Sequence, residues 1–463
     1  MKRVQLLSSS AALLCVAMSA ACSDATPPNV LIITVDTLRA DYLGPYGDLA
    51  SNTPNLDALA RSAALFEHAA APMPMTRPSH FSMLTSKYPR EHGVVNNTKA
   101  LPDSALSLAE ILDDEGYWTG AFVGVRLLRP RSGAAQGFDH FDYPEKVIER
   151  PAERVVSRAL HWLGNVPDEA PFLLWVHLFD PHIPYAPPPE FRPKTAEGMS
   201  TFDWQLLREI AEANLGDLPE EALQQALSLY RGEISYTDHW IGELLHGVDQ
   251  RFDPSETLVV FASDHGECFE NGVYFEHANC LSESSLRVPM MIRYPPDFAP
   301  GIRSEANVSL LDILPTILHA AELEVAEEFS GLPLQQADAF GDRQLLIQRP
   351  QLQRKEADSL LDGRRQVRTV AGQPILHEFR DSKRVGLIGT NWIYLRGTGQ
   401  EVLYRFSALD KPTRDLSETH PAVRQELSRQ LRKLLRATKR RNLGEQEVDE
   451  DLAETLEALG YVN

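Results

Sequence analysis

Three short runs of consecutive apolar residues most constrain how this chain can fold. They are residues 29–35 (NVLIITV), 172–178 (FLLWVHL) and 257–263 (TLVVFAS). Such runs are typical of parallel strands that are covered on both faces of a sheet. Each is followed by side chains that can bind a ligand: Asp36 after the first, Asp180 and His182 after the second, Asp264 and His265 after the third. Since open α/β sheets place their sites at the carboxyl ends of the strands, the runs predict one shared site.

The segments between these runs favour helices. Residues 107–117 and 222–246 space their apolar residues as amphipathic helices do. The alternation predicts an α/β fold with a mixed, mostly parallel doubly wound sheet flanked by helices. From about residue 340, short segments separated by turn signals predict a smaller C-terminal α+β domain, with a small antiparallel sheet and a helix near 417–436. We therefore expect a main domain at 29–338, the small domain at 339–436 and a solvated, charged tail at 437–463.

The first residues resemble an export signal. Lys2 and Arg3 precede an apolar run that is too short for a stable membrane anchor, which predicts a signal peptide at 1–21. Residues 19–22 (SAAC) resemble a bacterial lipoprotein box, in which the chain is cut before Cys22 and the thiol is acylated, leaving 22–28 as a tether. The alternative is an ordinary secretory signal with a chance cysteine. Both readings predict an exported protein of a bacterial cell envelope, facing the periplasm or attached to the outer membrane.

Cys268 and Cys280 are the cysteines that remain in the folded part of the chain. Their spacing matches no tetrahedral zinc pattern. In an oxidising compartment they form either a disulfide or two buried thiols.

The charge balance excludes one class of partner. There are 65 Asp and Glu against 45 Lys and Arg, a formal net charge of −20. Such a surface repels phosphate backbones and anionic head groups, so we expect no nucleic-acid partner. A lipid on Cys22 is the one membrane contact that we expect.

Residues 71–94 (APMPMTRPSHFSMLTSKYPREHGV) hold the best candidate for a nucleophile. Pro78 and Ser79 signal the start of a helix, with Thr76 just ahead of it, where the free backbone N–H groups stabilise an anion. Thr76 is either such a nucleophile or only a helix N-cap. Asp36, Asp264 and His265 supply ligands for a divalent cation such as Ca²⁺, Mg²⁺, Mn²⁺ or Zn²⁺, which would activate the Thr76 hydroxyl.

The chain resembles the sulfatase family of the alkaline phosphatase superfamily over nearly its whole length after the signal. The resemblance rests on the motifs NVLIITVDTLRADYLGPYG, TRPSHFSMLTSKYPREHGV, HLFDPHIPYAPP, YRGEISYTDHWIGELL, TLVVFASDHGE, EHANCLSESSLRVPMMIRYP, VSLLDILPTIL and LEALGYV. It implies a catalytic domain at 29–338 and a metal held by Asp36, Thr76, Asp264 and His265. It also implies that His182 and His277 contact the ester or protonate its leaving group.

Several positions depart from the family pattern. Position 76 is Thr where typical sulfatases carry a Cys or Ser that is oxidised to formylglycine, so we expect no formylglycine. Thr37 stands where many sulfatases have a second metal-binding Asp, and His80 replaces an Arg. These changes resemble the Thr-nucleophile phosphodiesterases of the superfamily, and they imply that His80 contacts substrate. Asn97 is either a second substrate contact or a turn residue, and Arg39 either neutralises an ester oxygen or pairs with Asp41.

The resemblance implies a hydrolase of sulfate, phosphate or phosphonate esters, acting on a small molecule, a glycan or a lipid. A threonyl ester must be hydrolysed by an activated water, which a second metal on Asp180, His182 and His277 would provide. A dinuclear phosphodiesterase is therefore one alternative. The others are a phosphoryl-group transferase and a catalytically inactive metal-binding lipoprotein.

Overall fold

The computed structural model describes residues 27–194, 218–270, 273–278 and 280–350, and, nearer the carboxyl end, 369–370, 373–374, 385–397, 401–405, 415–444, 446, 448–459 and 461. A large central sheet has the strand order β11-β2-β10-β6-β1-β5-β3-β4, with β9 paired to β2. Strands β1, β3, β4, β5 and β6 run parallel, as do β2 and β11, while β9 and β10 pair antiparallel with their neighbours. The predicted mixed, mostly parallel sheet is thus confirmed. The strands are β1 (Asn29–Val35), β2 (Ala64–Ala70), β3 (Trp118–Val123), β4 (His140–Asp142), β5 (Phe172–Leu178), β6 (Thr257–Ser263), β9 (Arg287–Val288), β10 (Met290–Arg293) and β11 (Arg303–Ser309).

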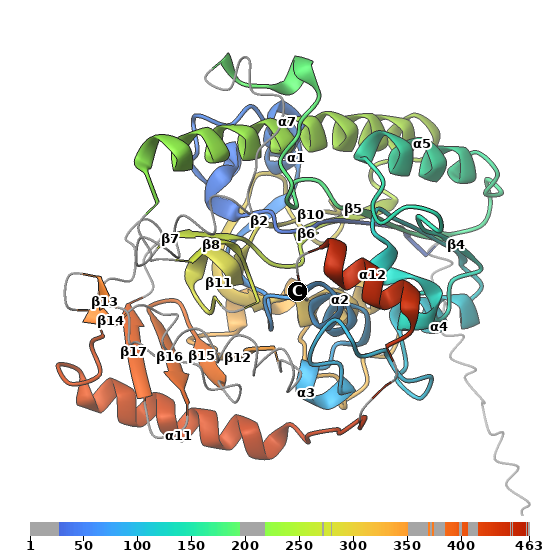
Figure 1. Ribbon diagram of the computed structural model, residues 1–463. Helices are drawn as coiled ribbons and strands as arrows, with labels where there is room; N and C mark the ends of the chain where they lie inside the picture. The colour runs from blue at the N-terminus through green and yellow to red at the C-terminus, as the bar shows by residue number, and fades with distance from the viewer. Residues whose placement is uncertain are drawn as a thin grey trace, which may run out of the picture.

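Helices cover both faces of this sheet (Figure 1). On one face lie α1 (Pro54–Ser62), α5 (Ala152–Leu163) and α7 (Glu220–Arg251); on the other lie α2 (Thr76–Thr85), α4 (Leu108–Asp114), α9 (Ile313–Ala320) and α12 (Glu450–Ala458). Side chains of β1 alternate between the two cores, with Leu31 and Ile33 in one and Val30 and Ile32 in the other. This double cover explains why the strand is apolar throughout. The short helices α3 (Pro89–His92) and α8 (Glu283–Leu286) complete this part.

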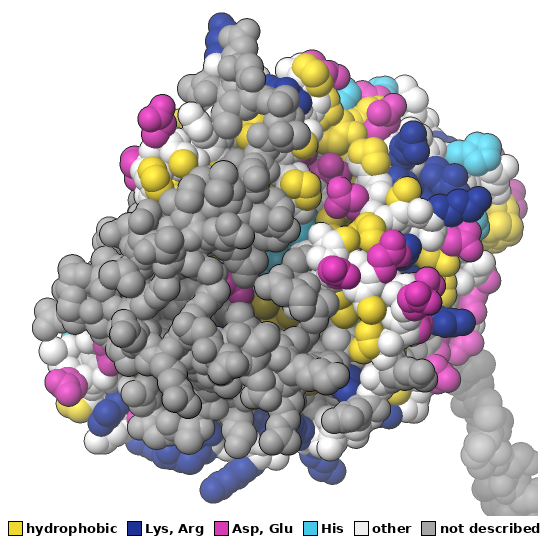
Figure 2. Space-filling view, viewed as in Figure 1, with side chains coloured by type: hydrophobic (Ala, Val, Ile, Leu, Met, Phe, Trp, Pro, Cys, Tyr) yellow, Lys and Arg dark blue, Asp and Glu magenta, His cyan; other side chains and the backbone are white. Residues whose placement is uncertain are grey.

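A second, four-stranded antiparallel sheet follows, in the order β12-β15-β16-β17. Its strands are β12 (Leu345–Gln348), β15 (Val385–Ile388), β16 (Trp392–Arg396) and β17 (Glu401–Arg405), and α11 (Pro421–Ala437) packs on it through Leu427 and Leu431. Both the small sheet and the helix were predicted. Lys and Arg side chains gather along the lower edge of the molecule in Figure 2, where α11 lies. Two short hairpins are β7 (Cys268–Glu270) with β8 (Val273–Glu276), and β13 (Thr369–Val370) with β14 (Gln373–Pro374).

The prediction of a solvated tail is wrong for its last helix. In α12 and just after it, Leu452, Leu456 and Leu459 are 5%, 3% and 7% exposed and belong to the same apolar core as α2 and α9. The charges of residues 446–457 dominate the sequence pattern, but these leucines fall on one helix face and are buried there. No helix among the described residues is long and apolar enough to span a bilayer.

Candidate active site

Three neighbouring parallel strands bring the predicted ligands together. Strands β5, β1 and β6 lie side by side, so their carboxyl ends meet at one edge of the sheet. Asp36 follows β1, and Asp264 and His265 follow β6; all three side chains are at most 1% exposed. The expectation of one shared site at the strand ends is therefore confirmed for these residues.

Thr76 lies at the same edge of the sheet, but its position relative to the helix differs from the prediction. Helix α2 begins at Thr76 itself, and its N-cap is Met75, so the N-cap alternative for Thr76 is wrong. Thr76 is fully buried, and its hydroxyl donates to Asp36 Oδ2 at 3.4 Å. The amino end of a helix favours negative charge. Negative charge on the oxygen at this position would therefore be stabilised by the helix, and the oxygen lies beside a carboxylate that accepts its hydrogen bond.

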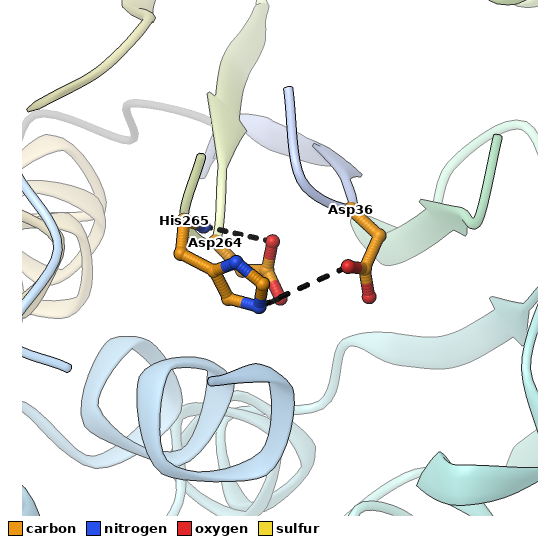
Figure 3. Close-up of side chains that lie close together, drawn as sticks. All are labelled: Asp36, Asp264 and His265. Atoms are coloured by element: carbon orange, nitrogen blue, oxygen red, sulfur yellow. Dashed lines mark hydrogen bonds and ion pairs between the residues drawn. The ribbon is translucent and has the colours of Figure 1, made fainter. Parts of the chain in front are cut away.

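The residues present fit a divalent cation. Single ligand atoms of Asp36, Asp264 and His265 lie within 4.8 Å of one another (Figure 3). His265 Nε2 is 3.4 Å from Asp264 Oδ2 and 3.8 Å from Asp36 Oδ1, and none of these three buried atoms has a hydrogen-bond partner. Buried polar atoms are normally paired. Three unpaired ones that face a common point, two of them carboxylate oxygens, are what a bound cation would satisfy.

The electrostatics of the site also favour a cation. Burial, followed by the negative charge of Asp36, raises the pKa of Asp264 well above its usual value. Burial lowers the pKa of His265, and its Nδ1 lies 3.1 Å from the Gly266 carbonyl, so the neutral ring has a free Nε2 lone pair towards the carboxylates. Two buried carboxyl groups beside a neutral imidazole are destabilising without a positive charge between them.

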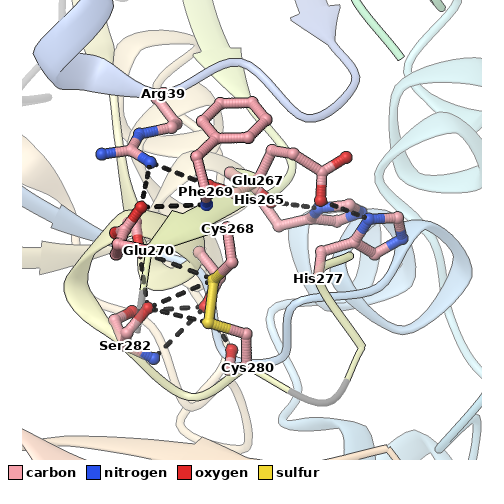
Figure 4. The surroundings of a disulfide bond; sticks show 12 residues. Arg39, His265, Glu267, Cys268, Phe269, Glu270, His277, Cys280 and Ser282 are labelled. Carbon is pink, nitrogen blue, oxygen red and sulfur yellow. Dashed lines mark hydrogen bonds and ion pairs between the residues drawn. A yellow bond between two sulfur atoms is a disulfide. The ribbon is translucent and has the colours of Figure 1, made fainter. Parts of the chain in front are cut away.

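His277 stands next to the metal group with a carboxylate behind it. Its Nδ1 is 3.3 Å from Glu267 Oε1, and its ring stacks on His265 with centroids 4.4 Å apart (Figure 4). Burial lowers the pKa of His277, but the charge and hydrogen bond of Glu267 outweigh it, and the net shift is upward. A raised pKa increases the protonated fraction of a His, which suits the role of general acid.

His182 joins this cluster, whereas Asp180 does not. The His182 ring lies 5.6 Å from that of His277, its Nδ1 is 2.7 Å from the Ile183 carbonyl, and its buried Nε2 has no partner. Asp180 Oδ2 instead accepts the backbone N–H of Ala152 at 2.9 Å. Within the described part of the chain, Asp36, Asp264 and His265 form the one group close enough to hold a metal. The predicted second metal on Asp180, His182 and His277 is therefore not assembled.

His80 lies beneath the site and not at its surface. Its Nδ1 is 2.8 Å from the Thr76 carbonyl and its Nε2 is 3.3 Å from Thr34 Oγ1, and the residue is 1% exposed. Both ring nitrogens have partners within the protein, and a contact of His80 with substrate stays a prediction. Thr34 also bonds His177 and Trp175, and none of these three residues was predicted as a site residue.

Asn97 Oδ1 accepts the N–H of Arg77 at the start of α2, while its buried Nδ2 has no partner. A role for that amide in binding substrate stays a prediction. The alternative for Arg39 as a partner of Asp41 is confirmed by contacts of 2.7 and 2.9 Å, and Arg39 also pairs with Glu270.

Cys268 and Cys280 form a disulfide, which confirms one of the two alternatives for them. The bond links β7 to the segment after His277 (Figure 4). Glu267 directly precedes Cys268, so the crosslink joins the segments that carry the carboxylate and its imidazole.

A doubly wound α/β sheet with a buried threonine hydroxyl beside a carboxylate–imidazole group at its strand ends is the arrangement of alkaline phosphatase-like ester hydrolases. Within that class the chain belongs to the sulfatase family, whose model, described as Sulfatase, matches residues 28–323.

Relatives agree with this assignment. The chain is 30% identical to an ulvan-active sulfatase of Formosa agariphila over 354 residues, which cover 70% of this chain and 68% of the relative. It is 24% identical to an N-acetylglucosamine-6-O-sulfatase of Bacteroides thetaiotaomicron, over 66% of this chain and 70% of that one. In fold it is similar to a phosphonate monoester hydrolase of Agrobacterium radiobacter, with a TM-score of 0.70 at 19% identity over 92% of this chain and 98% of the other.

Proposed function

We propose that the protein is a metal-dependent hydrolase of sulfate, phosphate or phosphonate esters that uses Thr76 as its nucleophile. The observation that carries the proposal is the position of the Thr76 hydroxyl, which donates to Asp36 in the same buried site as the unpaired atoms of Asp264 and His265. A hydroxyl needs an adjacent base or a metal to act as a nucleophile at neutral pH. Here Asp36 is the adjacent base, and Asp36, Asp264 and His265 are the group that would hold the metal.

The chemistry follows from the groups around Thr76. A divalent cation held by Asp36, Asp264 and His265 would supply Lewis-acid stabilisation of the developing negative charge. The Thr76 oxygen attacks sulfur or phosphorus while its proton passes to Asp36, and the ester oxygen leaves as its bond to that atom breaks. His277 protonates the departing oxygen, and Glu267 favours this role because it raises the pKa of His277 against the effect of burial. Water then attacks the threonyl ester and gives a proton to His277, and the Thr76 oxygen leaves and takes its proton back from Asp36.

The type of ester depends on how that second step occurs. A formylglycine hydrate can release sulfate by elimination, but Thr76 has a single hydroxyl and its ester must be hydrolysed by water. The relatives include sulfatases, and one fold neighbour is a phosphonate monoester hydrolase. With one metal group assembled, we favour a mononuclear hydrolase over the dinuclear phosphodiesterase, and the natural ester is a small molecule, a glycan or a lipid.

The test compares Thr76→Ala with Thr76→Ser on the metal-loaded protein. The substrates are p-nitrophenyl sulfate, bis-p-nitrophenyl phosphate and p-nitrophenyl phenylphosphonate, with metal content measured on the same samples. We expect one metal ion per chain, loss of at least about a thousandfold in kcat for the alanine variant and partial activity for the serine variant. An alanine variant as active as the parent protein would refute the nucleophile. Stable binding of a substrate without turnover would favour the binding-protein alternative, and transfer to an added alcohol would favour the transferase.

We also propose that the protein is exported and anchored through an acylated Cys22. The signal-like start, Lys2 and Arg3 included, supports this, although residues 1–26 lie outside the described residues. The disulfide fits an oxidising compartment. Cell fractionation tests the proposal, because Cys22→Ala should move the protein from the membrane to the soluble envelope fraction. An unchanged membrane fraction would contradict it.

A further inference from the structure

The carboxyl-terminal segment returns to the site after leaving the small domain. Helix α12 packs against the 3₁₀ turn η3 (Arg126–Leu128) and shares an apolar core with α2. Arg126 Nε donates to Thr455 Oγ1 at 2.9 Å and its guanidinium also pairs with Glu454. Arg129 pairs with Asp449 at the amino end of the helix. Together with the buried leucines of α12, these contacts fix the position of the helix and hence of the residues that follow it.

Tyr461 follows α12 and is the residue that this arrangement places near the site. Its backbone N–H donates to the Leu456 carbonyl at 2.8 Å, which turns the chain back after α12. Its ring packs against the apolar cluster of Met73, Met75 and Ala278, which borders the start of α2 and the loop of His277. The side chain therefore lies between the two segments that carry the predicted nucleophile and the predicted acid.

The phenol is aimed at the reacting groups. Tyr461 Oη is 2.9 Å from His277 Nε2, the nitrogen opposite the one held by Glu267, and the two rings meet edge to face at 5.7 Å. The hydroxyl also interacts with the Thr76 side chain. Glu267, His277 and Tyr461 thus form one hydrogen-bonded chain that ends next to Thr76. A residue needed only for packing could be apolar here, because its ring rests on Met and Ala side chains.

We propose that Tyr461 is a substrate-contacting residue that the carboxyl-terminal segment contributes to the active site. Its hydroxyl donates a hydrogen bond to an oxygen of the sulfuryl or phosphoryl group, and its ring closes the site on the side of His277. The ester oxygens in this arrangement lie where both the Thr76 oxygen and the His277 proton can reach them. The inference rests on the proposed function, since it assumes that an oxyanion group binds beside Thr76.

The experiment measures oxyanion binding and turnover separately. The variant is Tyr461→Phe, and the matched control is Glu457→Gln on the exposed face of α12. Binding of inorganic sulfate, phosphate and vanadate to the metal-loaded protein is followed by calorimetry, in the parent and in the Thr76→Ala background. Turnover of the three p-nitrophenyl esters gives kcat and KM. Thermal unfolding shows whether each variant keeps its fold.

We expect Tyr461→Phe to weaken oxyanion binding and to lower kcat/KM by about tenfold to a hundredfold, the range for a lost hydrogen bond to a charged group. The thermal midpoint should stay close to that of the parent, and Glu457→Gln should change none of these values. Oxyanion binding and kcat/KM equal to those of the parent would overturn the inference. So would faster turnover, because the phenol would then be an obstruction.

These outcomes are separable from failure of the proposed function. If Thr76→Ala remains active while Tyr461→Phe still loses oxyanion affinity, the nucleophile is wrong and the contact stands. If Thr76→Ala is inactive while Tyr461→Phe binds and turns over normally, the nucleophile stands and the contact is wrong.

Discussion

Replacing Thr34 by Val should destabilise the protein although the two side chains have the same shape. Thr34 lies on β1 and is 1% exposed. Its Oγ1 is 3.0 Å from Trp175 Nε1, 3.0 Å from His177 Nδ1 and 3.3 Å from His80 Nε2. These three side chains are at most 1% exposed, so water cannot replace the hydroxyl.

One hydroxyl contacts all three partners, and the tautomer of His80 follows from its partner atoms. His80 Nδ1 faces the Thr76 carbonyl and so carries its proton, which leaves Nε2 to accept the Thr34 hydrogen. Trp175 Nε1–H donates to the oxygen, and His177 Nδ1 is the third partner, while the Nε2 of that ring lies 3.6 Å from Asp36 Oδ2. Valine would leave three buried polar atoms unpaired at once.

The cost follows from this count. Each unpaired buried group costs about 1–3 kcal/mol, so three cost about 3 kcal/mol at the low end. The added methyl group recovers about 0.8 kcal/mol. A net loss of about 2–4 kcal/mol lowers the melting temperature by about 3–6 °C in a domain of about 300 residues. Since His80 also holds the Thr76 carbonyl, kcat should fall as well.

Calorimetry on the metal-loaded protein is the assay, and Thr34→Ser is the control, because it keeps the hydroxyl and loses only a methyl group, about 1 kcal/mol. The Thr34→Val midpoint should lie clearly below that of Thr34→Ser. A valine variant that melts with or above the serine variant would refute the reasoning, since the hydroxyl would then stabilise nothing.

Three further predictions concern other parts of the molecule. Burial, followed by the charge of Asp180, raises the pKa of Glu233, so the folded state holds a proton that the unfolded chain releases near pH 4.5. The free energy of unfolding then falls as the pH rises from 4.5 to the pKa of Glu233 in the folded state, by up to about 1.4 kcal/mol per pH unit. Glu233→Gln should flatten this slope in melting curves at pH 5–8. An unchanged slope would contradict the prediction. Gly137 has φ +83°, and a Cβ there would lie 2.2 Å from the Glu110 backbone nitrogen. We expect Gly137→Ala to cost at least about 2 kcal/mol in denaturant unfolding, and a neutral result would mean that this turn relaxes freely. Removal of metal by a chelator should lower the melting temperature of the parent, because a cation at a hundredfold excess over its Kd stabilises the folded state by about 2.7 kcal/mol. The melting temperature of Asp36→Asn should not change. Equal shifts in both proteins would exclude this group as the metal site.

Much of the fold could be predicted because it depends on local patterns. The strands at 29–35, 172–178 and 257–263 have the predicted bounds, since a continuous apolar run is stable only where both of its faces are covered. The helix at 421–437 and the small sheet before it follow from equally local signals. The tail was mispredicted because its charges hid a leucine face whose partner lies more than a hundred residues away in the sequence.

The sequence by itself determined which strand and helix ends bring the central residues of the site together. Asp36, Asp264 and His265 follow parallel strands directly, and Thr76 begins a helix, so chain direction alone brings them to one edge. Only the tertiary structure decided which other polar side chains join them. The Asp180 carboxylate accepts a hydrogen bond from the Ala152 backbone N–H and so does not join the site. Tyr461, near the end of the chain, contacts His277. The physical reason is that strand direction is encoded within a few residues, whereas the rotamer of a loop side chain and the docking of a distant helix depend on contacts that form only in the folded protein.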